Sequence, residues 1–90
     1  MEKPMFYIIV PIFNVEGYLK QCLDSIQNQS YANFKAILIN DGSTDKSGKI
    51  AESYAKNDKR FILHTQDNQG QSNARNKALE IIKNMLLPPP

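Results

Sequence analysis

The sequence is poor in several features, and each shortage excludes a class of protein. Its single cysteine, Cys22, excludes an internal disulfide and a cysteine-based zinc site. Its longest apolar run, Met5 to Phe13, is far shorter than the roughly 20 residues that a membrane-spanning helix requires. Its net charge of +2 is too small to indicate nucleic acid or an anionic membrane as a partner. We therefore expect neither a transmembrane segment nor a nucleic-acid ligand.

What remains is the composition of a small globular protein. The 90 residues are 41% hydrophobic and 22% charged, and they suffice for one domain at most, or part of one. The opening MEKP has no net positive charge and no small-x-small cleavage site follows, so a secretory signal is not indicated. We expect a cytoplasmic location. Cys22 stands at an apolar position of a predicted helix, which favours a packed thiol.

The chain repeats one pattern three times. Short apolar runs begin at Phe6, Phe34 and Phe61, 28 and 27 residues apart, which is the length of one strand plus one helix. After each run, apolar residues recur at the spacing of a helix that packs along one face. These positions are Val15, Leu19, Cys22, Leu23 and Ile26, then Ile50, Ala51, Tyr54 and Ala55, and finally Ala74, Ala78, Leu79, Ile82 and Met85. Asn14 and Ser72 are placed to cap the first and third helices.

The alternation of strands and helices predicts an α/β fold in the order β-α-β-α-β-α. Phe6 to Val10 is apolar without a break, as expected for a parallel strand that is covered on both faces. Right-handed crossovers between neighbours give a three-stranded parallel sheet of order 3-2-1 in a Rossmann-like three-layer sandwich. This order leaves the first strand on an open edge, and nothing in FYIIV prevents it from pairing with another chain. We therefore expect self-association through the first strand.

Three loops follow the strands, and in a parallel sheet they meet at one edge, where ligands bind. These loops are residues 11–16, 40–45 and 66–72. The second loop contains Asp41, for which two interpretations stand. Asp41 and Gly42 can simply form an Asx-type turn, or the carboxylate can accept hydrogen bonds from a ligand, such as the imide N–H of a base or a sugar hydroxyl. Ser43, Thr44 and Asp45 can cap the second helix under either interpretation.

Arg75 falls in the first turn of the third helix, where its positive charge opposes the helix dipole. It is either a solvent-facing arginine that tolerates this cost, or the partner of an anion held between the guanidinium and the helix N-terminus. A diphosphate would fit the second description. Asn68 and Gly70 come just before it, and Gly70 would let the backbone approach a ligand closely.

Three short motifs at the ends of successive strands resemble, in this order, the N-terminal part of a family-2 glycosyltransferase. They are PIFN at residues 11–14, NDGSTD at residues 40–45, and N-x-G-x-x-x-A-R-N at residues 68–76. The resemblance extends from residue 5 to about residue 83, which corresponds to the opening part of the family's GT-A domain. On this basis residues 1–90 are expected to be a truncated nucleotide-sugar-binding part of one glycosyltransferase domain, with residues 84–90 as a tail outside the family pattern.

This resemblance implies a site for a nucleotide sugar, most often a UDP-sugar. The implied binding residues are Pro11, Phe13, Asn14, Glu16, Asp41, Gly42, Ser43, Asn68, Gly70 and Arg75. In the family, the acid that matches Asp41 contacts the nucleotide base, residues 11–14 form a wall beside that base, and Glu16 lies near it. The arginine that matches Arg75 reaches towards the diphosphate. Phe13 stands where the family usually has tyrosine, so one hydroxyl group is absent here.

The resemblance also sets expectations for the whole enzyme. A full-length relative should be an inverting transferase that uses a divalent metal, Mg²⁺ or Mn²⁺, and a base that deprotonates the acceptor hydroxyl. The family's metal motif and base follow the part that matches here, so we expect no catalytic residue and no metal ligand within this chain. We expect the parent to be cytoplasmic or membrane-peripheral and to serve cell-surface polysaccharide synthesis. The alternative is an inactive remnant, or a small α/β interaction module with no nucleotide ligand.

Overall fold

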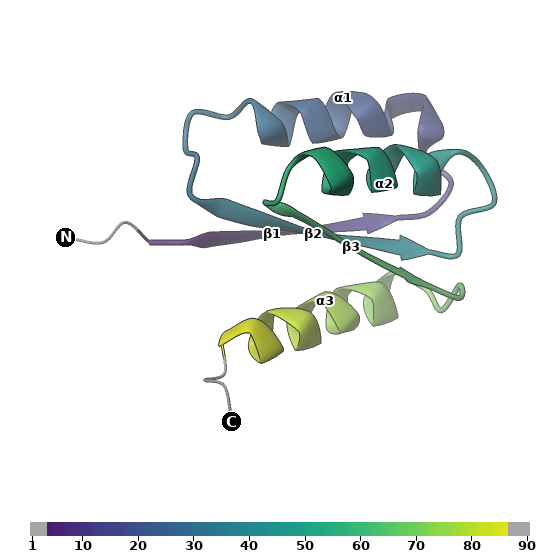
Figure 1. Cartoon of the computed structure of the whole chain (residues 1–90). Coiled ribbons are helices and arrows are strands. Elements are labelled where there is room, and N and C mark those ends of the chain that lie inside the picture. Colours follow the sequence, from purple (N-terminus) through teal and green to yellow (C-terminus); the bar gives the residue numbers. More distant parts are fainter. Residues whose placement is uncertain (1–3, 87–90) are drawn as a thin grey trace.

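Strands and helices alternate along residues 4–86, the part of the chain that the computed structural model describes (Figure 1). The elements are β1 (Phe6–Ile12), α1 (Glu16–Gln27), β2 (Phe34–Asp41), α2 (Ser47–Asn57), β3 (Phe61–Gln66) and α3 (Gln71–Leu86). Each strand begins at the phenylalanine from which the sequence predicts it. Apolar residues dominate the strands, as suits a sheet that is covered on both faces, although Lys35 interrupts the run in β2. The strands extend somewhat further than predicted at their carboxyl ends.

The three strands form a parallel sheet in the order β1-β2-β3, which confirms the predicted order. Phe6 pairs with Phe34, and Ala36 pairs with Phe61, at the start of the two strand pairs. The central strand β2 is fully buried from Ala36 to Ile39. Because the strands run in one direction, their carboxyl ends and the loops that follow lie at the same edge, on the right in Figure 1.

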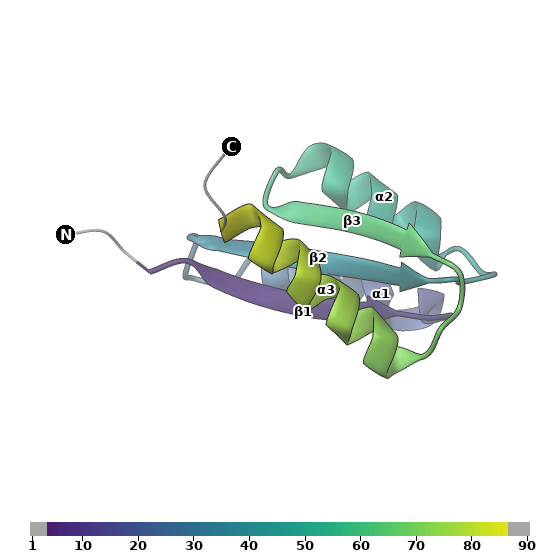
Figure 2. The same cartoon turned by 90° about the horizontal axis from the view of Figure 1, so that it is seen from below.

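Helices cover both faces of the sheet, so the fold has the three predicted layers. α1 and α2 pack side by side on one face, and α3 crosses the other face beneath β1 and β2 (Figures 1 and 2). The larger core, under α1 and α2, consists of Val10, Ile12, Leu19, Leu23, Phe34, Ala36, Leu38, Ala51 and Phe61. The smaller core, against α3, consists of Ile37, Ile39, Ala74 and Ala78. Successive residues of β2 alternate between the two cores, as the pleat of a strand requires.

Two predicted helix caps are wrong. Asn14 does not cap α1, because the N-cap position is Val15, whose side chain forms no capping hydrogen bond. Ser72 lies inside α3, whose first helical hydrogen bond runs from the N–H of Ala74 to the carbonyl of Gly70. In both cases a residue with positive φ, Asn14 at 51° and Gly70 at 94°, turns the chain one or two residues before the helix starts.

Three apolar residues of the helical pattern are more exposed than predicted. Cys22 is exposed and not packed, because α1 buries Leu19 and Leu23 and turns the cysteine away from the sheet. Leu79 is 53% exposed and Met85 is 36% exposed, because Ala74 and Ala78 occupy the face of α3 that meets the sheet.

The end of α3 lies within the predicted tail of residues 84–90. The helix continues to Leu86, whose side chain is 67% exposed, so the first three residues of the tail are helical. Residues 87–90 lie outside the described residues.

A polar cluster closes the edge of the larger core, at the amino end of the sheet. Asp58 accepts hydrogen bonds from the Arg60 guanidinium and from Gln27, and the guanidinium stacks on the Phe34 ring at 4.4 Å from its centroid. The hydrogen bonds from Arg60 hold the pKa of Asp58 well below its usual range, although burial opposes this shift. Asp58 is therefore a group that stabilises the fold only while it is ionised.

Acidification is expected to destabilise the chain through Asp58. Its pKa is lower in the folded chain than in the unfolded chain, so its contribution is complete above the unfolded pKa and is lost as the pH falls towards the folded pKa. The urea midpoint should therefore be lower at about pH 3 than at about pH 6. An Asp58→Asn variant should show a smaller difference between these two conditions. An equal difference in both proteins would assign the acid sensitivity to other carboxyl groups.

Candidate nucleotide-sugar-binding site

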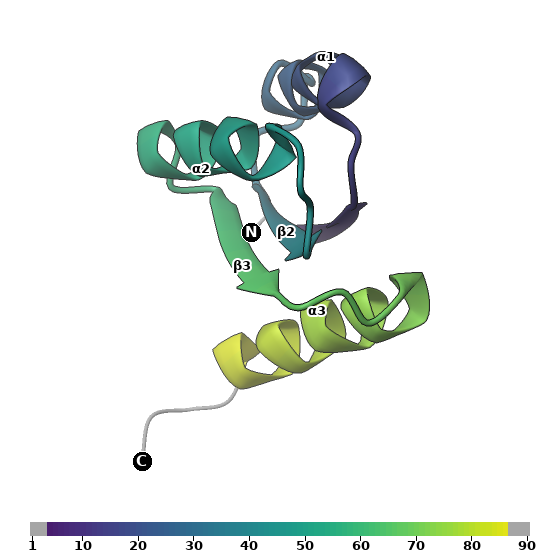
Figure 3. The same ribbon diagram turned by 90° about the vertical axis from the view of Figure 1, so that its right-hand side faces the viewer.

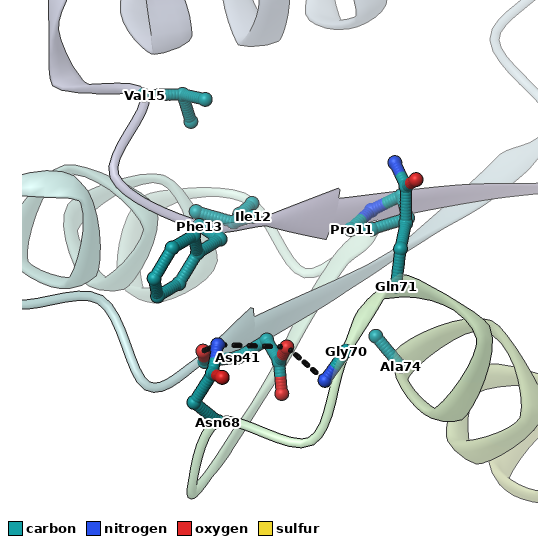
Figure 4. Close-up of a pocket in the computed structure, with 9 residues that line it drawn as sticks. All are labelled: Pro11, Ile12, Phe13, Val15, Asp41, Asn68, Gly70, Gln71 and Ala74. Atoms are coloured by element: carbon teal, nitrogen blue, oxygen red, sulfur yellow. Dashed lines mark hydrogen bonds between the residues drawn. The ribbon is translucent and has the colours of Figure 1, made fainter.

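A pocket of about 450 Å³ opens at the carboxyl edge of the sheet, the edge that faces the viewer in Figure 3. Residues from the end of β1, the end of β2 and the start of α3 surround it (Figure 4). They are Pro11, Ile12, Phe13, Val15, Asp41, Asn68, Gly70, Gln71 and Ala74. This volume is typical of pockets for small ligands, and this edge is where an open parallel sheet binds them.

The side chain of Asp41 forms the polar floor of the pocket. It is 4% exposed, and its carboxylate accepts hydrogen bonds from the loop between β3 and α3. One oxygen accepts from Gln66 Nε2 at 3.0 Å and from the N–H of Gln69 at 2.9 Å. The other accepts from the N–H of Gly70 at 3.0 Å and from Asn68 Nδ2 at 3.3 Å. A single side chain thus organises a loop that lies more than twenty residues away in the sequence.

The simple Asx-turn interpretation of Asp41 is wrong. The turn after β2 is stabilised by Asn40 instead, whose Oδ1 accepts the N–H of Ser43 at 3.2 Å. Asn40 is itself 5% exposed, so its amide belongs to the interior of the loop. Asp41 is left free to bond across to the neighbouring loop.

Asp41 is an anion at neutral pH. The hydrogen bond from Gln66 holds the pKa of Asp41 below its usual range, helped by the N–H groups of Gln69 and Gly70 and opposed by burial. A carboxylate has about four lone-pair sites, and here four donors use them. A ligand that donates to Asp41 must therefore displace one of these donors.

Gly42 brings the second and third loops into contact. Its φ of 74° lies in the left-handed region, and a Cβ at this position would stand 2.6 Å from the backbone nitrogen of Asn68. No ordinary Cβ contact is that short. The glycine is therefore needed both for the turn that follows Asp41 and for the close approach of the loop between β3 and α3.

The opposite wall of the pocket comes from the end of β1 and the residues after it. Phe13 is 48% exposed, and its ring extends towards Asp41 and Asn68 (Figure 4). Ile12 is fully buried and anchors this wall in the larger core. The pocket therefore combines an aromatic face with a carboxylate.

Half of the binding residues implied by the family resemblance line this pocket together. They are Pro11, Phe13, Asp41, Asn68 and Gly70. The others lie around it. Asn14 and Ser43 bond to each other between the first two loops, and the N–H of Glu16 donates to Asp45. Arg75 is exposed and forms no hydrogen bond or ion pair within residues 4–86.

The list of implied binding residues omits four that line the pocket, namely Ile12, Val15, Gln71 and Ala74. Ile12 falls within the predicted wall of residues 11–14 and Gln71 within the predicted loop of residues 66–72, whereas Val15 and Ala74 are assigned only to the apolar faces of the first and third helices. Gln71 directly follows Gly70, and Ala74 lies one helical turn after it, so the helix start itself was the available signal.

Residues 4–86 provide no set of metal ligands. Among them, no three His, Cys, Asp or Glu side chains come together in a way that could hold an ion. These residues therefore do not by themselves supply a complete set of protein ligands for a divalent metal. Within the same residues, none of the helices combines the length and the hydropathy that crossing a membrane demands.

Comparison with known proteins identifies relatives over nearly the whole chain. The sequence model of the family described as "Glycosyl transferase family 2" matches residues 7–85. Glycosyltransferase GlyA of Streptococcus pneumoniae is 49% identical over 72 residues, which are 80% of this chain and 10% of that protein. An uncharacterized glycosyltransferase of Haemophilus influenzae is 48% identical over 81 residues, 89% of this chain and 32% of that protein. The chain thus spans a third or less of the length of these relatives.

Solved structures share the fold. The chain superposes on S. aureus TarS with a TM-score of 0.76 and 30% sequence identity, over 86% of this chain and 24% of that one. It superposes on a mannosyltransferase from Pyrobaculum calidifontis, solved with GDP-Man and Mn²⁺, with a TM-score of 0.73 and 24% identity, over 89% of this chain and 25% of that one. The three-stranded α/β arrangement is therefore that of GT-A glycosyltransferases.

Proposed function

The chain belongs to glycosyl transferase family 2, and we propose that it forms the nucleotide-sugar-binding part of an inverting enzyme that transfers a sugar from a UDP-sugar to an acceptor hydroxyl. The observation that carries this proposal is the buried carboxylate of Asp41 on the floor of the pocket. A carboxylate only accepts hydrogen bonds, so it selects ligands that present an N–H or O–H group at that position. The imide N–H of uracil is such a group.

The base is proposed to lie between the first and third loops. The exposed ring of Phe13 offers an aromatic face for it, and Pro11 continues this wall. On the other side, Gly70 has no heavy atom within 4 Å of the place where a Cβ would stand, so there is room beside the backbone. Uracil would thus meet an apolar wall and donate its N–H towards Asp41.

Binding of a base requires Asp41 to release one donor, and Asn68 is the one we propose. Its bond to the Asp41 carboxylate is 3.3 Å long, while its Nδ2 also donates to the Asp41 backbone carbonyl at 3.0 Å. Asn68 can therefore release the carboxylate and keep a hydrogen bond. The backbone N–H groups of Gln69 and Gly70 donate to the carboxylate alone and are fixed by the loop, so they stay in place.

Arg75 is proposed to bind the diphosphate. It is exposed, free of partners within the described residues, and one turn after Gln71, which lines the pocket. A diphosphate at this position would meet both a guanidinium and the N-terminus of α3. Ser43 and Glu16 are proposed to border the base and ribose. The Ser43 hydroxyl accepts the N–H of Asn14, which leaves its own O–H free to donate to a sugar.

The remaining chemistry is proposed to come from outside residues 4–86. In the complete enzyme a divalent metal, Mg²⁺ or Mn²⁺, would offset the charge of the leaving diphosphate, and a base would take the proton of the acceptor hydroxyl. The described part of this chain would bind the donor and orient it. We propose a cytoplasmic enzyme of cell-surface polysaccharide synthesis, and the exposed thiol of Cys22 suits a reducing compartment.

A nucleotide titration tests this proposal. UDP should bind more tightly than uridine because Arg75 adds a charged hydrogen bond, and Arg75→Ala should lower the affinity for UDP about tenfold while uridine binds as before. Lys83→Ala removes an exposed cation from the last turn of the same helix and should change neither affinity. Amide chemical shifts of the ¹⁵N-labelled chain, followed during each titration, give the dissociation constants for UDP and for uridine.

Two outcomes would count against the proposal. If the amide signals of Asp41, Gly42 and Arg75 do not move at millimolar UDP, the result favours the alternative, an interaction module that binds no nucleotide. If GDP binds more tightly than UDP, the pocket takes guanine, as the GDP-Man complex of the mannosyltransferase would suggest.

Self-association through β1 is a second proposal, since within the described residues this strand pairs on one side only. Phe6 is 54% exposed at its start, and the strand carries no charge. The sedimentation coefficient should therefore rise with concentration, and Tyr7→Lys should suppress the rise because a charge on an edge strand opposes pairing. Thr65→Lys places the same charge on β3 and should have little effect. A monomer at all concentrations would refute this proposal.

A further inference from the structure

The start of α1 is held by side chains from another part of the chain. A helix leaves its first N–H groups without partners in the helix, and α1 has no side-chain cap of its own. The N–H of Val15 donates to the Ser47 hydroxyl at 2.9 Å, and the N–H of Glu16 donates to the Asp45 carboxylate at 3.1 Å. Ser47 is fully buried, so its hydroxyl serves this contact and not solvent.

The contact is reciprocal. Asn14 adopts a left-handed backbone conformation, with φ at 51°, and its side-chain oxygen accepts the N–H groups of Thr44 at 2.8 Å and of Asp45 at 3.3 Å. The N–H of Asn14 donates to the Ser43 hydroxyl at 3.1 Å. Asparagine tolerates this conformation better than most residues with a side chain, and here its hydrogen bonds to the loop after β2 hold it. The loop after β2 and the loop after β1 therefore fix each other.

These bonds act on the wall of the pocket. β1 ends at Ile12, and the pocket-lining residues Phe13 and Val15 lie on either side of Asn14. These bonds are not the only contacts that hold α1 on the sheet, because its buried side chains Leu19 and Leu23 pack in the larger core. The bonds to Ser47 and Asp45 attach the chain directly after Phe13 and Asn14 to the loop after β2 and to the start of α2.

We infer that Asp45 and Ser47 are positioning residues of the nucleotide site, although neither lines the pocket. By holding the N–H groups of Val15 and Glu16, they set the distance between the Phe13 ring and the Asp41 carboxylate, and so the width of the slot for the base. This inference rests on the proposed function. It also assigns Asn14 to the support of the wall and not to contact with the ligand.

The test compares Ser47→Ala, Asp45→Ala and Asp45→Asn by uridine titration and by amide hydrogen exchange. Loss of a capping acceptor should accelerate exchange at Val15 or Glu16 and weaken uridine binding about fivefold, with exchange at Gln69 and Gly70 unchanged. The N–H groups of Glu16 and Ser47 bond to different carboxylate oxygens of Asp45, so an asparagine can accept only one of them, and Asp45→Asn should lose nearly as much as Asp45→Ala.

A matched control separates positioning from stability. Tyr54→Phe removes a hydrogen bond between α1 and α2, which the Tyr54 hydroxyl donates to Asp24. This hydrogen bond involves none of the loops around the pocket. Tyr54→Phe should lower the melting temperature and leave uridine affinity unchanged. Normal uridine affinity in Ser47→Ala and in both Asp45 variants, despite faster exchange at Val15 and Glu16, would overturn the inference.

If the unmodified chain binds no uridine, the proposed function fails, and the positioning role is then decided without a ligand. The ring proton signals of Phe13 should shift in Asp45→Ala and Ser47→Ala and stay in place in Tyr54→Phe. Unshifted signals in all three variants would overturn the inference as well. The two failures are therefore distinguishable.

Discussion

Replacing Asp41 with alanine is expected to weaken uridine binding by at least about tenfold, since a hydrogen bond to a charged group contributes about 1.5–3 kcal/mol. The variant would lose the acceptor that we propose for the base. It would also leave the N–H groups of Gln69 and Gly70 without the partner they now have at 2.9 and 3.0 Å. The loop that forms one side of the pocket should loosen, and exchange at these two amides should accelerate.

Asp41→Asn should be nearly as harmful as Asp41→Ala. The two backbone donors bond to different carboxylate oxygens, Gln69 to Oδ1 and Gly70 to Oδ2. An asparagine has one oxygen and one NH₂ group, so in either orientation a donor faces a donor. Uridine titration and amide exchange of the two variants measure this comparison.

Asp67→Asn is the matched control for Asp41. Asp67 lies in the loop between β3 and α3, which contains the donors to Asp41, and it is exposed. Its side chain forms no hydrogen bond or ion pair within residues 4–86. Its loss removes the same charge without removing an acceptor, so uridine affinity should be unchanged. If Asp41→Asn and Arg75→Ala weaken uridine binding equally, the assignment of Asp41 to the base is wrong, because Arg75 should matter chiefly when phosphates are present.

The second large effect is expected for Gly42→Ala, which should destabilise the chain by about 2–4 kcal/mol. Two costs add up. A residue with a Cβ is strained in the left-handed conformation at φ 74°. Its Cβ would also lie 2.6 Å from the backbone nitrogen of Asn68, and a backbone atom cannot move away by a change of side-chain rotamer. The loop between β3 and α3 would have to shift, and Asp41 would lose part of its hydrogen bonding with it.

Two further glycines separate these costs. Gly70 has φ 94° but nothing within 4 Å of the point that a Cβ would occupy, so Gly70→Ala should show the backbone cost alone, about 1–2 kcal/mol. Gly17 lies in α1, with no neighbour within 4 Å and without a positive φ, so Gly17→Ala should be neutral or stabilise by up to about 1 kcal/mol. Urea denaturation of the three variants gives this series. A Gly42→Ala variant no less stable than Gly70→Ala would show that the contact with Asn68 yields easily.

The sequence was sufficient for the framework of the fold. Phe6, Phe34 and Phe61 open the three strands, and each strand is rich in apolar residues because helices cover both faces of the sheet. Such stretches are visible in the sequence even though Lys35 interrupts the one in β2. The sheet order followed from the handedness of crossovers, which holds for nearly all parallel units. The same rules bring the ends of the strands to one edge, so the sequence by itself places Pro11, Asp41 and Gly70 near one pocket.

Only the tertiary structure decided what the polar side chains at that edge bind. Asparagine and aspartate near a helix start usually cap their own helix, and this local rule failed at Asn14, which bonds to residues 30 and 31 positions away. Asp41 likewise finds its donors 25 to 29 positions away. A periodic apolar pattern is repeated over many residues and so can be read from the chain. A hydrogen bond between two loops depends on a single pair of atoms, and those atoms come within reach only after the sheet has set the loops side by side.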